Sequence, residues 1–134
     1  MMSNTNNDFY QSVTGLLQGG ESKQAVRKLE AFLDTHKDDE IALSLYGSAL
    51  LRSGKTEQAL GAFRHAVTVH PESFSSHADL AFIAMKTGDI KQAIESFENA
   101  TRLSPRLYPA WAFLGKLHFE AGNYKAALEA VEKA

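Results

Sequence analysis

The sequence repeats itself at a constant period, and this period limits the folds that are available to it. Gly20, Gly54, Gly88 and Gly122 are equally spaced along the chain. Four further series keep the same spacing: Ala25, Ala59, Ala93 and Ala127; Leu29, Phe63, Phe97 and Val131; Phe32, Ala66, Ala100 and Ala134; and the pair Pro71 and Pro105. A fixed period of this length is the signature of an array of like structural units stacked along one direction. The chain therefore does not fold around a single irregular core.

Within one period, the apolar residues follow helical spacing. Leu43, Tyr46, Gly47 and Leu50 recur at three and four residues, as on one face of a helix. The Gly of each period provides a turn with positive φ after a first helix, and Pro71 and Pro105 end second helices. The pattern predicts about eight helices in four pairs. The first helices are expected at 8–18, 41–53, 74–87 and 108–121, and the second helices at 22–35, 56–69, 90–103 and 124–134.

Composition excludes several function classes. The chain has no cysteine, and 14 Lys and Arg against 16 Asp and Glu give a formal net charge of −2. Disulfides and thiolate metal sites are therefore ruled out, and no basic cluster indicates nucleic-acid binding. The five histidines lack metal-ligand spacing, and no phosphate-binding loop occurs, so we expect no metal and no cofactor. Residues 1–8 do not resemble a signal peptide, and no apolar stretch approaches membrane-spanning length, so a cytoplasmic location without membrane contact is expected.

The last three units carry the motif of a known family. The final unit has Trp111, Leu114 and Gly115, while the second and third units have an Ala and a Phe four residues apart, followed by Pro. This pattern resembles the tetratricopeptide repeat, whose units have the same length as the period of this chain. The resemblance implies an all-α, right-handed α-solenoid of stacked antiparallel helix pairs. The units are 6–39, 40–73, 74–107 and 108–134, and the first is degenerate, with Val13 and Phe32 at positions that are otherwise small.

The resemblance also implies a non-catalytic protein-interaction scaffold. In this family the first helices of successive pairs line a concave face that binds a peptide or a partner segment. The positions carried over to this chain are Ser44, Ser48, Arg52, Ala78, Phe82, Met85, Lys86, Ala112, Lys116 and Phe119. Leu51, Met85 and Phe119 have a second interpretation as buried residues between units, because every unit has an apolar residue there. An alternative function is an N-terminal region that recruits partners for a downstream catalytic, membrane or envelope-assembly domain.

Other functions find less support in the residues. Ser73, Ser75, Ser76, His77 and Asp79 contain the residue types of a hydrolase triad, but serines at a helix start are expected to be caps. We therefore predict no enzyme activity. The positions that form a Lys and Asn clamp for acidic C-termini in related co-chaperones carry other residues here. RNA-binding pentatricopeptide arrays have a slightly longer period than this chain.

The last unit is incomplete. It stops at Ala134, which occupies the place where Ala66 and Ala100 are expected to contact a following unit. A complete array normally ends in a helix with a polar outer face. The sequence therefore predicts truncation from a longer protein and an exposed apolar C-terminal edge, through which copies of the chain could associate as a homo-oligomer.

Overall fold

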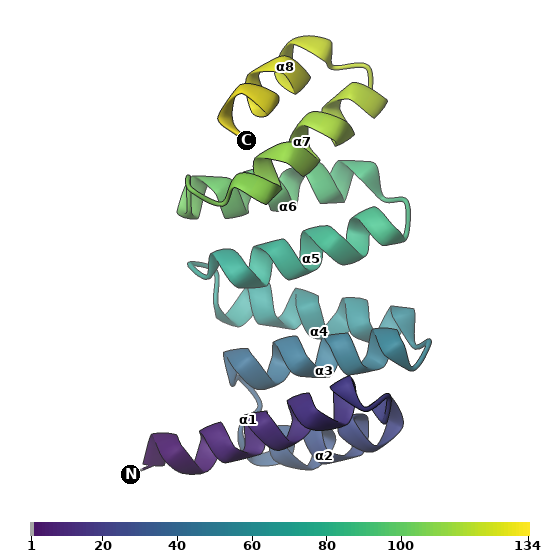
Figure 1. The fold of residues 1–134 in the computed structure, drawn as a ribbon, viewed down its shortest axis with the longest axis vertical. Helices are drawn as coiled ribbons and strands as arrows, with labels where there is room; N and C mark the ends of the chain where they lie inside the picture. The colour runs from purple at the N-terminus through teal and green to yellow at the C-terminus, as the bar shows by residue number, and fades with distance from the viewer. Residues whose placement is uncertain (1) are drawn as a thin grey trace. The chain divides into compact units, whose positions relative to one another are not determined.

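The computed structural model describes the backbone of residues 2–134 and the side chains of residues 6–134, and Figure 1 shows its fold. Over these residues the chain forms helices joined by short turns, without a strand. The eight helices of the described part are α1 (Met2–Gln18), α2 (Ser22–Thr35), α3 (Glu40–Arg52), α4 (Thr56–Val69), α5 (Phe74–Lys86), α6 (Ile90–Leu103), α7 (Tyr108–Glu120) and α8 (Tyr124–Lys133). By their contacts they divide into two compact units, Met1–Val69 and His70–Ala134, and each is described by itself.

The helices lie close to their predicted positions, with one exception. α1 begins at Met2, six residues before the predicted start, because the polar residues that precede Asp8 have no apolar periodicity with which to place a helix. The other boundaries differ from the prediction by at most a residue or two. In the part of the chain that the structure describes, each helix is too short or too polar to cross a membrane.

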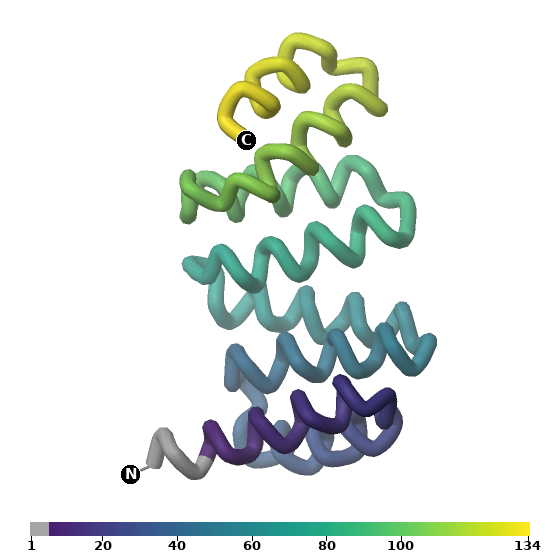
Figure 2. The backbone as a smooth tube through the Cα atoms, in the orientation of Figure 1, coloured from purple at the N-terminus to yellow at the C-terminus, as the bar shows by residue number. Residues whose placement is uncertain are grey.

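One turn geometry recurs in all four pairs. Gly20, Gly54, Gly88 and Gly122 have φ of 80°, 80°, 82° and 84°, a region that favours glycine. In each pair the residue after this Gly donates its backbone N–H to a carbonyl five residues earlier, as from Asp89 to Ala84 at 2.9 Å. The two helices of a pair consequently run antiparallel, as the chain path in Figure 2 shows for α5 with α6 and for α7 with α8.

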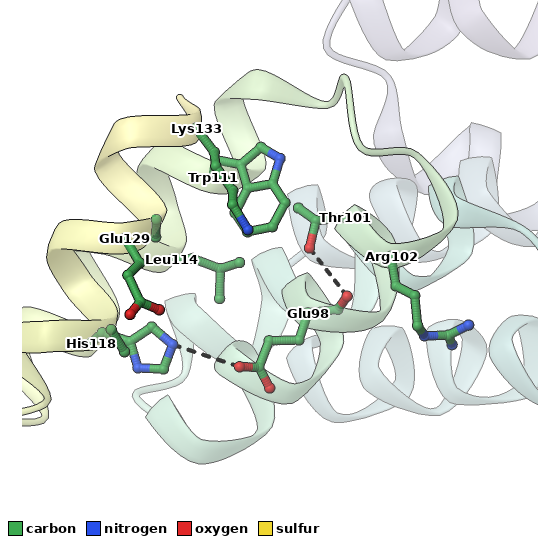
Figure 3. A pocket seen from close by; sticks show the side chains of 10 residues that line it. Glu98, Thr101, Arg102, Trp111, Leu114, His118, Glu129 and Lys133 are labelled. Atoms are coloured by element: carbon green, nitrogen blue, oxygen red, sulfur yellow. Dashed lines mark hydrogen bonds and ion pairs between the residues drawn. The ribbon is translucent and has the colours of Figure 1, made fainter.

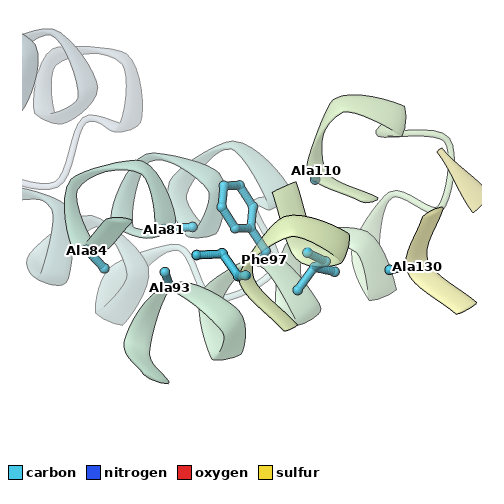
Figure 4. Packing of buried hydrophobic residues seen from close by; sticks show 8 residues of the cluster. Ala81, Ala84, Ala93, Phe97, Ala110 and Ala130 are labelled. Carbon is cyan, nitrogen blue, oxygen red and sulfur yellow. The ribbon is translucent and has the colours of Figure 1, made fainter. Parts of the chain in front are cut away.

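Aromatic residues from the second helices fill the core of each unit. In the first unit, a Cβ placed on Gly47 of α3 would lie 2.3 Å from Cε1 of Phe63 of α4, so the absent side chain makes room for the ring. In the second unit, Phe97 of α6 is fully buried in a cluster with small residues of α5, α6, α7 and α8 (Figure 4). In both units, the large aromatic residue of a second helix thus packs against the small residue of the first helix.

The first pair departs from this pattern, as the sequence suggested. Val13 is fully buried where the other pairs have Gly47, Ala81 or Gly115, and Phe32 stacks between Phe9 and His36 with ring centroids 4.2 and 4.1 Å away. A bulky residue at the close-packing position holds two helices further apart. Polar contacts that the repeat pattern does not predict connect α1 to α3 and to the N-cap of α3.

Two hydrogen bonds connect α1 to α3 and to its N-cap. The hydroxyl of Tyr10 donates to Oδ2 of Asp39 at 2.6 Å, while Oδ1 of Asp39 accepts from the backbone N–H of Ala42 and caps α3. Nη1 of Arg52 donates to the carbonyl of Leu17 at 2.9 Å. Partial burial and the Asp39 carboxylate raise the pKa of Tyr10 to about 12, since both disfavour the phenolate.

Candidate functional site

The predicted binding positions of the first unit all lie on α3. Ser44 and Ser48 are half-buried, and Arg52 is exposed at the C-terminal end of the helix. Because the guanidinium of Arg52 is bonded to the carbonyl of Leu17, part of its donor capacity serves the fold. At the predicted positions of α3, two half-buried hydroxyl groups and a partly engaged guanidinium are therefore the polar groups present.

The positions on α5 divide into exposed and packed residues. Phe82 is 42% exposed and Lys86 is exposed, whereas Ala78 and Met85 are half-buried. Met85 packs against the core cluster around Phe97, so at this position the interpretation as a buried residue is the better one. The ring of Phe82 is also partly structural, because it makes edge contacts with Phe97 and Phe113 at centroid distances of 5.3 and 5.2 Å.

The positions on α7 are all exposed. Ala112 and Lys116 lie on the surface, and Phe119 is 63% exposed. The side chain of Phe119 is thus exposed and that of Met85 is half-buried, although the two residues occupy the same position of the repeat. Its ring contacts Tyr124 of α8 at a centroid distance of 5.3 Å.

An apolar hollow of about 860 Å³ runs between α7 and α8. We call it the α7–α8 groove, and its lining residues are Ala112, Gly115, Lys116, Phe119, Glu120, Tyr124, Ala127, Leu128 and Val131. Ala112, Lys116 and Phe119 are among the predicted peptide-binding residues, whereas the α8 residues are expected from the sequence only as part of an exposed apolar C-terminal edge. The signal that could have found the α8 side was the repeat itself, because Val131 continues the series of Leu29, Phe63 and Phe97.

A second, more polar cavity of about 290 Å³ lies among α6, α7 and α8 and is shown in Figure 3. Lys133 Nζ lies 4.7 Å from the ring centroid of Trp111, and His118 Nε2 lies 3.6 Å from Oε2 of Glu98. The indole N–H of Trp111 donates to the carbonyl of Pro105 at 2.9 Å. Trp111, Lys133, His118 and Glu98 are thus engaged with one another or with the backbone.

The serine and histidine cluster at the start of α5 has a structural role. Ser73 Oγ accepts from the backbone N–H of Ser76 and caps the helix, as predicted. Nε2 of the buried His77 donates to the carbonyl of Pro71 at 2.9 Å, the same bond that Trp111 makes to Pro105 one repeat later. That nitrogen is consequently unavailable as a base toward a serine. Across the described residues, no three acidic or histidine side chains gather in a way that could hold a metal ion.

Sequence comparison decides the family. A sequence model of the tetratricopeptide repeat matches residues 10–76, and a second tetratricopeptide repeat model matches residues 84–134. The chain belongs to the tetratricopeptide repeat (TPR) family. None of the curated proteins matches its sequence.

Solved structures of TPR proteins have the same fold. The crystal structure of MamA superimposes with a TM-score of 0.85 at 18% identity, over 93% of this chain and 73% of MamA. MamA from Desulfovibrio magneticus RS-1, residues 41 to the end, gives 0.80 at 22% identity, over 93% and 71%. YrrB, described as a TPR protein with an unusual peptide-binding site, gives 0.77 at 18% identity, over 93% and 64%. The chain is thus an all-α TPR solenoid, a fold that supports protein-interaction scaffolds.

Proposed function

We propose that this TPR protein is a non-catalytic scaffold that binds a peptide or an extended partner segment along the first helices of its pairs. The exposure of the Phe82 side chain is the observation that supports this proposal most strongly. A phenylalanine that is 42% exposed, on the helix type that the family uses for recognition, provides an apolar contact for a ligand. Lys86 is exposed one turn further along α5, so a cation lies beside the aromatic ring.

The chemistry of this surface favours a ligand with apolar and acidic side chains. Phe119 and Lys116 repeat the combination of aromatic ring and cation on α7. Aromatic side chains bury a large apolar area on binding, while lysines at the rim select acidic partners and raise the association rate. The first unit, taken by itself, is a weaker candidate, because Ser44 and Ser48 of α3 are half-buried and Arg52 is bonded to the carbonyl of Leu17.

Selection from a random peptide library, displayed on phage and panned against the purified protein, tests the proposal without a known partner. We expect enriched sequences that combine a large apolar residue with Asp or Glu. The affinity of a selected, fluorescein-labelled peptide is then measured by fluorescence polarisation. Lys86→Glu is expected to weaken binding about tenfold, because it replaces attraction by repulsion.

Lys91→Glu is the matched control, since Lys91 is an exposed lysine of the neighbouring α6 and the charge change is identical. Its affinity should stay within about twofold of the wild type. A second variant, Phe82→Lys, copies the residue that the chain itself has at the equivalent position of α7, Lys116. Peptides that bind Lys86→Glu and Lys91→Glu equally well would place the recognition surface elsewhere.

A further inference from the structure

Two adjoining hollows in the first unit are bordered by four cationic side chains. One hollow, of about 430 Å³, lies between the start of α2 and the end of α3, and the other, of about 320 Å³, lies between α2 and the turn from α3 to α4. Lys23, Arg27 and Ser53 line both hollows. Arg52 borders the first and Lys55 the second. We call the two hollows together the α2–α3 basic site.

The positive charge of this site is not neutralised within the unit. All four cationic side chains are exposed, and over the residues that the structure describes none of them forms an ion pair. Lys23 and Arg27 are four residues apart on α2, where like charges repel each other. Glu21 and Glu30 are the acidic residues of the lining, and Glu30 already accepts a hydrogen bond from Tyr46 at 3.0 Å. A bound anion would relieve the repulsion among the cations.

The start of α2 adds backbone donors to the same site. Its N-cap residue, Glu21, makes no side-chain hydrogen bond to the first turn of the helix. The first helical hydrogen bond runs from the N–H of Ala25 to the carbonyl of Glu21 at 3.1 Å. Ser22, Lys23 and Gln24 precede this bond and line the first hollow. Uncapped N–H groups at the start of a helix, together with the helix dipole, favour phosphate groups.

The hydroxyl of Ser53, the residue between the two hollows, lacks a hydrogen-bond partner. Its Oγ has less than 1 Å² of exposed area, and among the described side chains it is the one buried polar atom without a hydrogen bond. An unpaired buried hydroxyl destabilises the folded state, so the fold alone does not account for a serine here. Because Ser53 lines both hollows, rotation about its Cα–Cβ bond would turn the hydroxyl toward a bound anion.

The equivalent positions of the second unit, two repeats later, have a different chemistry. Lys91 keeps the charge of Lys23, but the other positions become acidic or neutral: Arg27 is replaced by Glu95, Arg52 by Glu120, Ser53 by Ala121 and Lys55 by Asn123. The start of α6 is also capped, because the side chain of Asp89 accepts from the N–H of Gln92 at 3.1 Å. The repeat fold therefore requires neither the cations, nor the serine, nor an uncapped helix start.

We propose that the α2–α3 basic site binds a small molecule with two linked phosphate groups, either inorganic diphosphate or a nucleoside diphosphate. Phosphate oxygens accept from guanidinium, ammonium, hydroxyl and backbone N–H donors, and the site has all four kinds. Two hollows that share Lys23, Arg27 and Ser53 provide space for one phosphate each. Nη1 of Arg52 donates to the carbonyl of Leu17, which holds the guanidinium in place and leaves its other N–H groups for the ligand. This site goes beyond the proposed peptide surface, because it lies in the first unit and on a second helix.

Isothermal titration calorimetry with sodium pyrophosphate, at constant ionic strength, tests this site. We expect saturable binding of one molecule per chain, with orthophosphate at least about tenfold weaker. Arg27→Glu, which copies Glu95, should weaken pyrophosphate binding at least about tenfold, because it replaces attraction by repulsion. Arg64→Glu is the matched control, since Arg64 is an exposed arginine of α4 outside both hollows, and its affinity should remain within about twofold.

Ser53→Ala separates a role in binding from a role in the fold. The variant copies Ala121 and removes an unpaired hydroxyl, so the midpoint of urea unfolding without ligand should not fall, while pyrophosphate affinity should fall at least about threefold. In ¹⁵N NMR spectra, the amide signals of Ser22, Lys23 and Gln24 should shift as pyrophosphate is added. The same titration with ADP identifies the source of the diphosphate: tighter binding than pyrophosphate indicates a nucleotide, and weaker binding indicates the inorganic ion.

Three results would overturn the proposal. They are pyrophosphate binding that does not saturate, orthophosphate that binds as tightly as pyrophosphate, and equal affinities of the Arg27→Glu and Arg64→Glu proteins. A lowered unfolding midpoint with unchanged affinity in Ser53→Ala would also count against it, because the hydroxyl would then serve the fold. Lys86→Glu should leave pyrophosphate binding unchanged, which distinguishes this site from the peptide surface of the second unit.

Discussion

The pairs α5–α6 and α7–α8 have nearly the same backbone and very different surfaces. Gly88 and Gly122 have φ of 82° and 84°, and the N–H of the following residue donates to Ala84 at 2.9 Å and to His118 at 2.8 Å. Yet Phe97 is fully buried, whereas Val131, its equivalent, is 56% exposed. The turn is therefore set by residues within one period, while burial depends on whether another helix lies over the pair.

The largest effect on stability should come from truncating Phe97, the buried member of the two equivalent residues. Phe97→Ala removes a ring that is fully buried against α7 and should lower the free energy of unfolding by about 3–5 kcal/mol. Val131→Ala at the equivalent uncovered position should cost below about 1 kcal/mol. Urea unfolding followed by circular dichroism measures both. Similar costs for the two variants would mean that Val131 is covered in solution.

Replacing two equivalent glycines, Gly47 and Gly115, by alanine should change the free energy of unfolding by less than Phe97→Ala, and in opposite directions. In Gly47→Ala the new methyl group would lie 2.3, 2.4 and 2.8 Å from three ring atoms of the buried Phe63, and we expect destabilisation by about 1–3 kcal/mol. In Gly115→Ala the methyl group meets a single atom at such a short distance, Cγ2 of Val131 at 2.6 Å. That exposed side chain can rotate away, so the gain in helix propensity of up to about 1 kcal/mol should dominate.

The same unfolding experiment distinguishes the two glycines. If Gly115→Ala also lowers the midpoint, Val131 is held in place by something that covers the groove. If Gly47→Ala is neutral, the ring of Phe63 has room that the structure does not show. Either result would contradict the difference seen in the structure, in which Gly47 faces a buried ring and Gly115 faces an exposed side chain.

The periodic features were the ones that the sequence predicted. Turns, helix pairs and the cap at Ser73 follow from residues within one period, so sequence spacing was sufficient. Met85 and Phe119 could not be told apart, because they share a position and differ only in whether a neighbour covers them. The sequence predicts an exposed apolar edge at the end of the chain but names no peptide-binding residue on α8, because the family resemblance directs attention to first helices. Contacts such as that of Tyr10 with Asp39 have no periodic signal.

The hydrogen bond between Tyr10 and Asp39 should contribute about 1 kcal/mol to the free energy of unfolding. It extends the comparison to the first helix pair, where a polar contact takes the place of close packing between helices. Tyr10→Phe removes the hydrogen bond to the carboxylate and should lower the free energy of unfolding by about that amount at neutral pH. The pKa of Tyr10 is raised from 10.0 to about 12, so the folded state binds this proton more tightly than the unfolded state.

The stabilisation that Tyr10 contributes is therefore complete below pH 10 and disappears as the pH rises toward 12. The difference in stability between wild type and Tyr10→Phe should narrow over this range when unfolding is measured at successive pH values. Because the variant experiences every other titration in the chain, the difference isolates this residue. A difference that stays constant from neutral pH into this range would show that the phenol and the carboxylate do not interact in solution.

The smallest effect on stability is expected at Leu128 of the α7–α8 groove. Leu128→Gln should change the free energy of unfolding by less than about 0.5 kcal/mol, because the side chain is 62% exposed. Ile94→Gln at the equivalent position beneath α7 should cost more, since Ile94 packs against the core cluster. The Leu128→Gln result should also be independent of protein concentration. A cost that grows with concentration would mean that association of copies stabilises the wild type through this groove, because ligand binding to the folded state adds to its stability by mass action.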